Sequence, residues 1–179
     1  MHKKLFVLAI ALTFTGKFYS LPIAYSCTSC TTDLMTDLMK AIAARQSPTV
    51  ISQIISRGAD VNAVDSEFLR KIKPVLRYAL DRGYDDESVE IIKMLIAAGA
   101  DVNQVTYNRV TDKNVRGMMP LLTYAAIYSS AEIVQILVDA GAQDKIISES
   151  DECTFKETAL TIAKKLRKSA IVKVLEQIK

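Results

Sequence analysis

Histidine is almost absent from this sequence, and its absence excludes several kinds of catalytic site. The only histidine among the 179 residues is His2, which lies in an N-terminal stretch that we expect to be cleaved off. A mature chain without an imidazole cannot activate a serine or cysteine nucleophile through histidine, and it cannot form a histidine-containing zinc site. The sequence also contains no glycine-rich phosphate-binding loop and no cluster of metal ligands. We therefore predict no catalytic residues, no metal ion and no cofactor.

A large excess of either charge is also absent. The chain has 23 lysines and arginines against 20 acidic residues. Lys3, Lys4 and Lys17 lie in the N-terminal stretch, and without them 20 basic residues face 20 acidic ones. Because general nucleic-acid binding depends on a basic surface, we predict no nucleic-acid partner.

Residues 1–26 have the features of a secretory signal. The basic start MHKK precedes the apolar run Leu5–Gly16, which is too short to span a bilayer. Ala24 and Ser26 place small residues where signal peptidase requires them, so that Cys27 would become the first mature residue. We predict an exported protein, either periplasmic or secreted.

Two other fates of the same stretch stay open. Leu5–Ser26 is almost continuously apolar, as in an uncleaved membrane anchor, although Lys17 and Pro22 in its middle disfavour that reading. In a lipoprotein, Cys27 would be acylated, although Tyr25 is bulkier than the small residue usual before such a site. We expect membrane contact only through the signal, the anchor or this lipidation.

Cysteine is scarce, with Cys27, Cys30 and Cys153 only. In an oxidising compartment, an odd number leaves one thiol unpaired or bonded to another molecule. Cys27 and Cys30 have the spacing of a redox pair, but we expect them in a flexible segment, residues 27–35, rather than at the helix N-terminus that redox chemistry requires. A structural disulfide from Cys27 or Cys30 to Cys153 is the alternative, and the pairing stays open.

What the sequence does contain is a repeated phrase. GADVN occurs at residues 58–62 and again at 99–103, and an eroded copy, GAQDK, occurs at 141–145. An apolar stripe with helical spacing precedes each copy, for example Ile91, Ile92, Leu95 and Ile96. We predict that Gly58, Gly99 and Gly141 end these helices in the left-handed conformation.

A second, shorter helix is predicted upstream of each stripe. It recurs in TDLMKAI, PVLRYAL, PLLTYAA and TALTIAK, which start at residues 36, 74, 120 and 158. In each copy a leucine is followed three residues later by an alanine, a small residue that allows neighbouring helices to approach closely. The leucines are Leu38, Leu76, Leu122 and Leu160.

Start signals accompany the longer helices. We predict N-caps at Ser47, followed by a proline, at Asp86 and at Ser169, and a capping box over Ser129–Glu132.

Together these patterns resemble the ankyrin repeat family, and the third unit, PLLTYAAIYSSAEIVQILVDAGA, is the best match. The resemblance implies an all-α solenoid of about four helix-turn-helix units, at residues 36–65, 74–106, 120–145 and 158–179 within a domain spanning 36–179. It also implies β-hairpin fingers after each glycine phrase and a concave surface of fingers and short inner helices that binds proteins. This sequence departs from the family in lacking the histidine of Thr-Pro-Leu-His and in having longer fingers.

The last unit is predicted to cap the stack, because charged side chains replace the apolar or small residues of the interior units. Examples are Lys164, Lys165, Arg167, Lys168 and Lys173.

The long fingers and the ends of the inner helices are the predicted contact surface. Arginine and aromatic residues dominate the energetics of protein interfaces. The predicted contacts are Phe68, Arg70, Lys71, Asp81, Arg82, Tyr107, Arg109, Arg116 and Tyr128. Tyr78 and Tyr124, which recur at one position of the inner helix, are predicted to pack in the core.

The favoured function is therefore a non-enzymatic, monomeric module that binds a partner protein. A periplasmic inhibitor or immunity protein against a toxic enzyme is a more specific alternative, and a host-directed bacterial effector is another. The remaining alternative is a thiol redox protein that uses Cys27 and Cys30.

Overall fold

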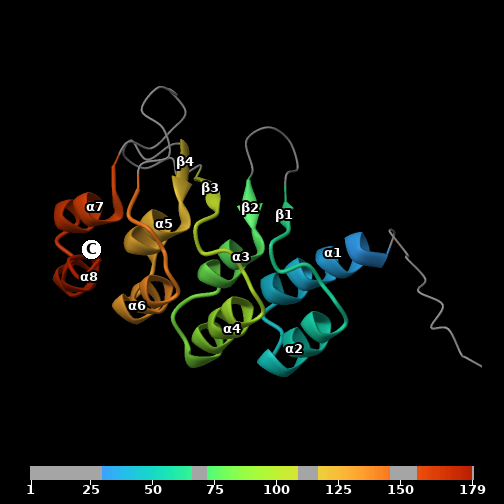
Figure 1. Ribbon diagram of the computed structural model, residues 1–179. Coiled ribbons are helices and arrows are strands. Elements are labelled where there is room, and N and C mark those ends of the chain that lie inside the picture. Colours follow the sequence, from blue (N-terminus) through green and yellow to red (C-terminus); the bar gives the residue numbers. More distant parts are fainter. Residues whose placement is uncertain (1–29, 66–71, 109–116, 146–156, 179) are drawn as a thin grey trace, which may run out of the picture.

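A computed structural model describes residues 30–65, 72–108, 117–145 and 157–178 of the chain, and these residues form helical pairs joined by short hairpins (Figure 1). In chain order the elements are α1 (Cys30–Ala43), α2 (Pro48–Ser56), β1 (Val64–Asp65), β2 (Lys73–Pro74), α3 (Val75–Asp81), α4 (Asp86–Ala97), β3 (Val105–Asn108), β4 (Gly117–Pro120), α5 (Leu121–Tyr128), α6 (Ala131–Asp139), α7 (Ala159–Lys165) and α8 (Ser169–Leu175).

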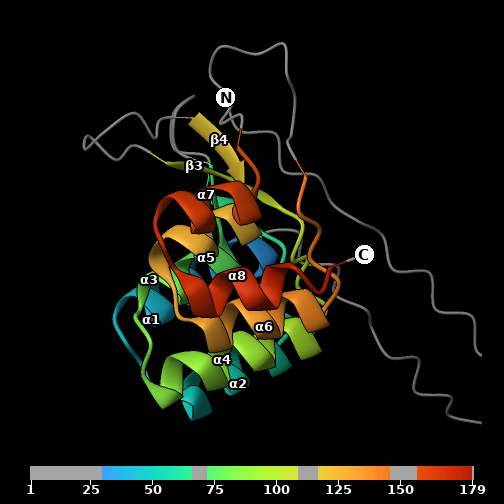
Figure 2. The same ribbon diagram turned by 90° about the vertical axis from the view of Figure 1, so that its left-hand side faces the viewer.

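The helical pairs stack in single file, which confirms the predicted solenoid. The inner helices α1, α3, α5 and α7 lie between the hairpins and the outer helices α2, α4, α6 and α8 (Figures 1 and 2). α1 packs on α3 and α5 on α7, while α2 packs on α4 and α6 on α8. The backbones of α3 and α5 approach each other less closely, so side chains carry more of the contact between the second and third units.

The core includes many of the leucines and stripe residues that the repeat pattern predicts, whereas others, such as Ile96 of α4, are only partly buried. Leu38, Leu76 and Leu122 are fully or almost fully buried, and Leu160 in the last unit is partly buried. The outer helices bury their stripes against them, as Ile91, Ile92 and Leu95 do in α4. Each unit thus covers an apolar face of its neighbour, and this burial is the main stabilising contribution in the stack.

The three glycines of the repeated phrase end the outer helices as predicted. Their φ angles are 91° at Gly58, 92° at Gly99 and 89° at Gly141. An L-residue with a side chain rarely adopts this conformation, yet a Cβ added at any of the three positions would meet no atom within 4 Å. Glycine is therefore required by the backbone angle and not by crowding.

The predicted helix starts are corrected at several positions. Asp85, not Asp86, is the N-cap of α4 and accepts a hydrogen bond from the Ser88 backbone N–H. Ser130, one residue later than the predicted capping box, is the N-cap of α6.

Two further helix starts differ from the prediction in other ways. Ser47 occupies the N-cap of α2 but makes no capping hydrogen bond, and Lys168 precedes α8 in place of the predicted Ser169. α1 begins at Cys30, so the helix includes residues 30–35, which the sequence predicted within the flexible N-terminal segment. They contain neither glycine nor proline, and nothing in them stops the helix.

Asparagines of the repeated phrase connect one unit to the next. The Asn62 side-chain amide donates to the Gly99 carbonyl (2.9 Å), and its oxygen accepts from the Asp101 backbone N–H (2.7 Å). Asn103 repeats both contacts one unit later, with Gly141 (3.2 Å) and Gln143 (2.9 Å). The phrase therefore recurs for two reasons, because it ends a helix and because it fixes the spacing of successive turns.

Two of the predicted fingers begin as antiparallel hairpins. β1 pairs with β2, and β3 pairs with β4 over Val105–Asn108 and Gly117–Pro120. The hairpins are also linked to each other, because the Tyr107 backbone N–H donates to the Ile72 carbonyl at 2.9 Å. Among the helices that the structure describes, none is long and apolar enough to cross a bilayer.

Candidate functional site

A polar and aromatic cluster joins the second unit to the third. It consists of Lys73 at β2, Arg77, Tyr78 and Asp81 of α3, and Tyr124 of α5, and we call it the Asp81 cluster. The cluster lies where the backbones of α3 and α5 are further apart, so that long side chains fill the space between them. It is on the inner helices, beside the bases of both hairpins.

Asp81 is the centre of this cluster. Its Oδ1 accepts hydrogen bonds from Arg77 Nε (2.9 Å) and from the Tyr124 hydroxyl (2.8 Å), and its Oδ2 lies 3.0 Å from Lys73 Nζ. The Arg77 bond joins residues i and i+4 of one helix, whereas the Tyr124 bond spans 43 residues of sequence. One carboxylate therefore ties two units and a hairpin together.

The two cations of the cluster also lie on tyrosine rings. The Arg77 guanidinium carbon is 3.3 Å from the Tyr124 ring centroid, and Lys73 Nζ is 3.8 Å from that of Tyr78. Arg77 Nη1 donates to the Thr106 hydroxyl of β3 (3.1 Å), and Tyr78 donates to Asp65 of β1 (2.7 Å). These contacts hold each long side chain in one orientation before any partner arrives.

The electrostatics of the cluster follow from this geometry. Burial alone would raise the pKa of Asp81, but the charge of Arg77 and the hydrogen bonds from Arg77, Tyr124 and Lys73 outweigh it and hold that pKa below its usual range. Burial is also the main reason that the pKa of the Tyr124 hydroxyl is raised, and the neighbouring Asp81 acts in the same direction while Arg77 opposes it. Asp81 is thus ionised and Tyr124 neutral around pH 7, and both are engaged in holding the site together.

An exposed aromatic edge continues the cluster towards the ends of α3 and α5. The rings of Tyr124 and Tyr128 lie 4.6 Å apart between centroids. Tyr84, just after α3, donates its hydroxyl to the Tyr128 backbone carbonyl. Tyr84 is 61% exposed, which is the highest value among the large hydrophobic residues that the structure describes. The edge therefore presents an aromatic surface whose position is set by a hydrogen bond across two units.

The structure places the predicted contact residues in three groups. Asp81 belongs to the cluster, Tyr128 to the aromatic edge, and Tyr107 to β3, where it is half-buried. Other predicted contacts lie outside the described residues. They are Phe68, Arg70, Lys71, Arg109 and Arg116.

The prediction of Arg82 as a partner contact is wrong, because its side chain is only 3% exposed. Its guanidinium donates to the Gln46 carbonyl (2.8 Å) and to Glu87 (3.2 Å), while Arg45 donates to the Arg82 carbonyl. Arg82 thus connects the first unit to the second. Nothing in the sequence indicated that the preceding unit would enclose this arginine at the end of a helix.

The disulfide candidates also fall largely outside what the structure describes. Cys27 and Cys153 lie outside the described ranges, and Cys30 is the first residue of α1.

Several functional candidates were missed or given another role by the sequence reasoning. Tyr124 is buried as predicted, but its hydroxyl and ring make polar contacts, and Tyr78 is only half-buried. Lys73 and Arg77 are brought to Asp81 and the tyrosines by the fold. The four-residue spacing of Arg77 and Asp81 was a usable signal, since an i, i+4 pair on a helix is within reach of an ion pair.

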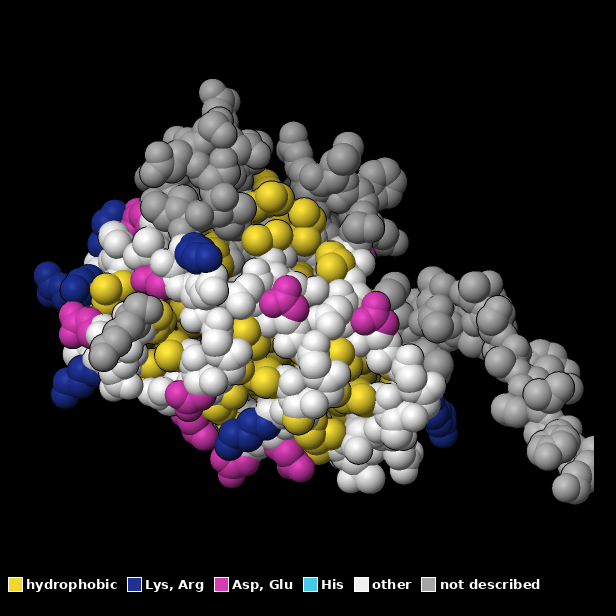
Figure 3. Space-filling model, viewed as in Figure 1, with side chains coloured by type: hydrophobic (Ala, Val, Ile, Leu, Met, Phe, Trp, Pro, Cys, Tyr) yellow, Lys and Arg dark blue, Asp and Glu magenta, His cyan; other side chains and the backbone are white. Residues whose placement is uncertain are grey.

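Arginine and tyrosine, residue types that are enriched at the hot spots of protein interfaces, make up much of the cluster. Asp81, the carboxylate at its centre, has its oxygens occupied by three donors. Within the described part of the chain, no three histidine, cysteine or acidic residues lie close enough together to hold a metal ion. Figure 3 shows one side of the molecule, where the white areas of backbone and uncharged polar side chains alternate with yellow apolar patches.

Comparison with known proteins gives one clear result. The family model for ankyrin repeats (3 copies) matches residues 76–178, which includes α3 to α8 almost entirely. A comparison with curated proteins found no match.

Proposed function

The chain belongs to the ankyrin repeat family, and on that premise we propose that it is an exported, non-enzymatic binding module whose partner protein contacts the Asp81 cluster and the Tyr84–Tyr128 edge. The coarse role, a protein-protein interaction module, comes with the family. The site and the location are our proposal.

The exposure of Tyr84 is the observation that carries the choice of site. A tyrosine that is 61% exposed and yet held by a hydrogen bond to another unit loses little conformational freedom when a partner covers it. Tyrosine and arginine are the residue types most enriched at interface hot spots, and this site combines Arg77 with Tyr84, Tyr124 and Tyr128. The pre-ordered contacts around Asp81 lower the entropic cost of binding further.

The sequence of residues 1–26 supports export. A basic start, an apolar run and small residues before Cys27 are together the features of a secretory signal. Mass spectrometry of the mature N-terminus would test this part, since a chain that starts at Met1 would contradict cleavage and an acylated Cys27 would indicate a lipoprotein.

Affinity capture with matched variants tests the binding site. The bait is the mature protein, the source is an extract of the compartment to which it is exported, and captured proteins are identified by mass spectrometry. Tyr84→Ala is expected to weaken the partner's affinity by at least about tenfold, since hot-spot truncations cost about 2 kcal/mol. The melting temperature should change little, because the side chain is exposed.

Leu166→Ala is the matched control. Leu166 is the other exposed large hydrophobic residue within the described ranges (46%), and it lies after α7 at the far end of the stack. It should leave capture unchanged. Equal capture by wild type and Tyr84→Ala would reject the proposed site, and an equal loss in both variants would show that the effect is not specific to it.

A further inference from the structure

Charge is distributed unevenly along the stack. The described residues of the last unit, 157–178, contain five basic side chains, Lys164, Lys165, Arg167, Lys168 and Lys173, and only two acidic ones, Glu157 and Glu176. The other described residues contain eight basic and 13 acidic side chains. The C-terminal end is therefore positive, whereas the rest of the described stack is negative.

The basic side chains of the last unit differ in whether they have an ion-pair or hydrogen-bond partner. Lys165 pairs with Glu157 (2.7 Å), Lys164 pairs with Glu176 (3.0 Å), and Lys168 Nζ donates to the Ile127 carbonyl (2.6 Å). Arg167 and Lys173 have no ion pair or side-chain hydrogen bond within the described part of the chain. Lys164 and Glu176 are both more than half exposed, and such a pair contributes little to stability and can exchange partners.

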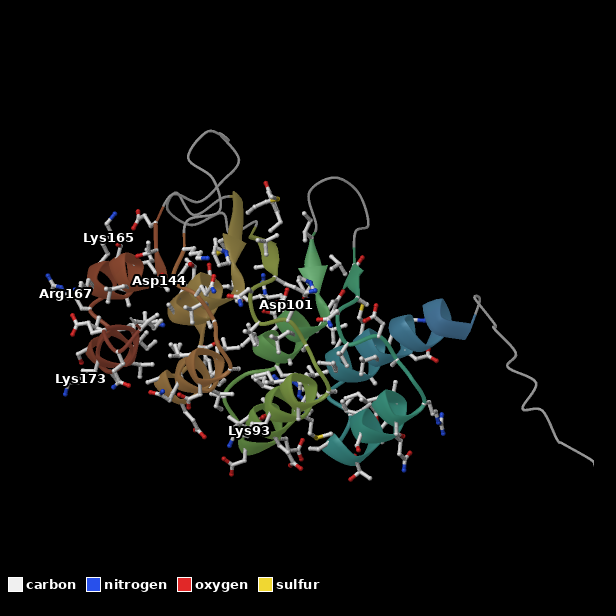
Figure 4. All side chains as sticks on the ribbon, in the orientation of Figure 1. Lys93, Asp101, Asp144, Lys165, Arg167 and Lys173 are labelled. Atoms are coloured by element: carbon white, nitrogen blue, oxygen red, sulfur yellow. The ribbon has the colours of Figure 1, made fainter. Side chains whose placement is uncertain are left out.

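Arg167, Lys173 and Lys164 surround one shallow depression. Ser169 and Val172 complete its lining, and its volume is about 430 Å³. Arg167 and Lys173 extend away from the ribbon at the end formed by α7 and α8 (Figure 4). In the space-filling view, lysine and arginine side chains gather at that same end (Figure 3). We call this surface the basic cap.

We propose that the basic cap binds an acidic segment of a partner protein. Carboxylates of such a segment would meet Arg167 and Lys173, while an apolar side chain between them would cover the half-buried Val172. The cap is at the far end of the last unit, and the Asp81 cluster is between the second and third. Either proposal can therefore fail without the other.

The chemistry of the cap favours an acidic peptide over the other polyanions. A nucleic acid would extend beyond this small basic area onto the negative units next to it, where like charges repel. Membrane-surface binding commonly relies on aromatic side chains or an apolar helix face. The described residues of the last unit, 157–178, include no aromatic side chain. Ile171 and Leu175 of α8 are buried inside the protein.

Fluorescence anisotropy with a defined probe tests this proposal. The probe is a labelled nonapeptide with four glutamates on each side of one leucine, and its neutral control has glutamines in place of the glutamates. The protein should bind the acidic peptide more tightly than the neutral one, and raising the salt concentration should weaken that binding. Arg167→Asn together with Lys173→Gln should weaken it about three- to tenfold, since each exposed ion pair contributes up to about 1 kcal/mol.

The variants are chosen so that the substitutions do not disturb folding. Asparagine at position 167 tolerates the left-handed conformation found there, where φ is 56°. Arg57→Asn together with Lys93→Gln removes the same charges from exposed positions at the outer helices α2 and α4 (Lys93 is labelled in Figure 4). This control should bind like wild type, and all proteins should have similar melting temperatures.

Three outcomes would overturn the proposal. These are equal affinity for the acidic and neutral peptides, an equal loss of affinity in both double variants, and cap-dependent binding to anionic phosphatidylglycerol vesicles or a single-stranded oligonucleotide without binding to the acidic peptide. Loss of peptide binding in the cap variant alone, with capture of the partner through Tyr84 unaffected, would support it.

Discussion

At the scale of single residues, Asp81 joins side chains from a hairpin and from the inner helices of two units. Its three donors come from β2, α3 and α5, so the loss of its charge affects a hairpin and two units at once. The same contacts lower its pKa, and this links the stability of the site to pH.

Stability is therefore expected to fall in acid through Asp81. A carboxyl with a lowered pKa in the folded state stabilises the protein fully above its unfolded value, here 3.8, and loses that contribution as the pH falls through the folded value. Asp81→Asn should cost about 1 to 3 kcal/mol at pH 7, because an amide offers only one acceptor to three donors. The variant should also lose less stability than wild type between pH 5 and pH 3, as measured by urea unfolding.

Asp139→Asn is the matched control for this measurement. Asp139 is exposed at the end of α6 and accepts only a hydrogen bond from Gln135 among the described residues. Its variant should keep the wild-type pH dependence. If Asp81→Asn and Asp139→Asn behaved alike, the cluster would not be the source of the acid sensitivity.

At the scale of elements, the start of α6 shows how one position changes the role of a serine. The Ser130 hydroxyl accepts from the Ile133 backbone N–H at 3.3 Å, whereas the Ser129 hydroxyl is buried and has no partner within the described structure. The sequence pattern, a serine followed three residues later by a glutamate, favoured Ser129. The tertiary structure shifted the cap by one residue, because α5 ends at Tyr128 and Ser129 is enclosed in the turn between α5 and α6.

The two serines should respond in opposite ways to the same substitution. Ser130→Ala is expected to destabilise the protein by about 1 kcal/mol, because it leaves a helical N–H without its acceptor. Ser129→Ala should be neutral or slightly stabilising, because it removes a buried hydroxyl that has no hydrogen bond. Thermal unfolding of the pair checks this, and a larger loss in Ser129→Ala than in Ser130→Ala would contradict the assigned cap.

At the scale of the whole molecule, stability is distributed over the junctions between units. The turns are joined by Asn62 and Asn103, while the helices are joined by buried leucines and isoleucines. In such a stack, each junction contributes approximately independently. The molecule is therefore a row of similar contacts that presents different side chains in each unit, with the Asp81 cluster in the middle and the basic cap at one end.

The asparagine bridges should show this independence. Asn62→Ala and Asn103→Ala each remove two hydrogen bonds at an exposed turn, and each should cost about 1 kcal/mol. The double variant should lose about the sum, because the side chains of the two asparagines bond to different residues. Urea unfolding measures all three, with Gln53→Ala on the exposed face of α2 as the control that should resemble wild type.

By itself, the sequence determined the repeating unit, because helix periodicity, leucine anchors and glycine stops are local properties that need no knowledge of the neighbouring unit. Gly58, Gly99 and Gly141 end their helices as predicted, and the apolar stripes form the core. Only the tertiary structure decided which polar side chains meet. It brought the Tyr124 hydroxyl to Asp81, 43 residues away in sequence, and enclosed the Arg82 side chain against the first unit. The spacing and rotation of successive units decide which of these side chains come within hydrogen-bond distance.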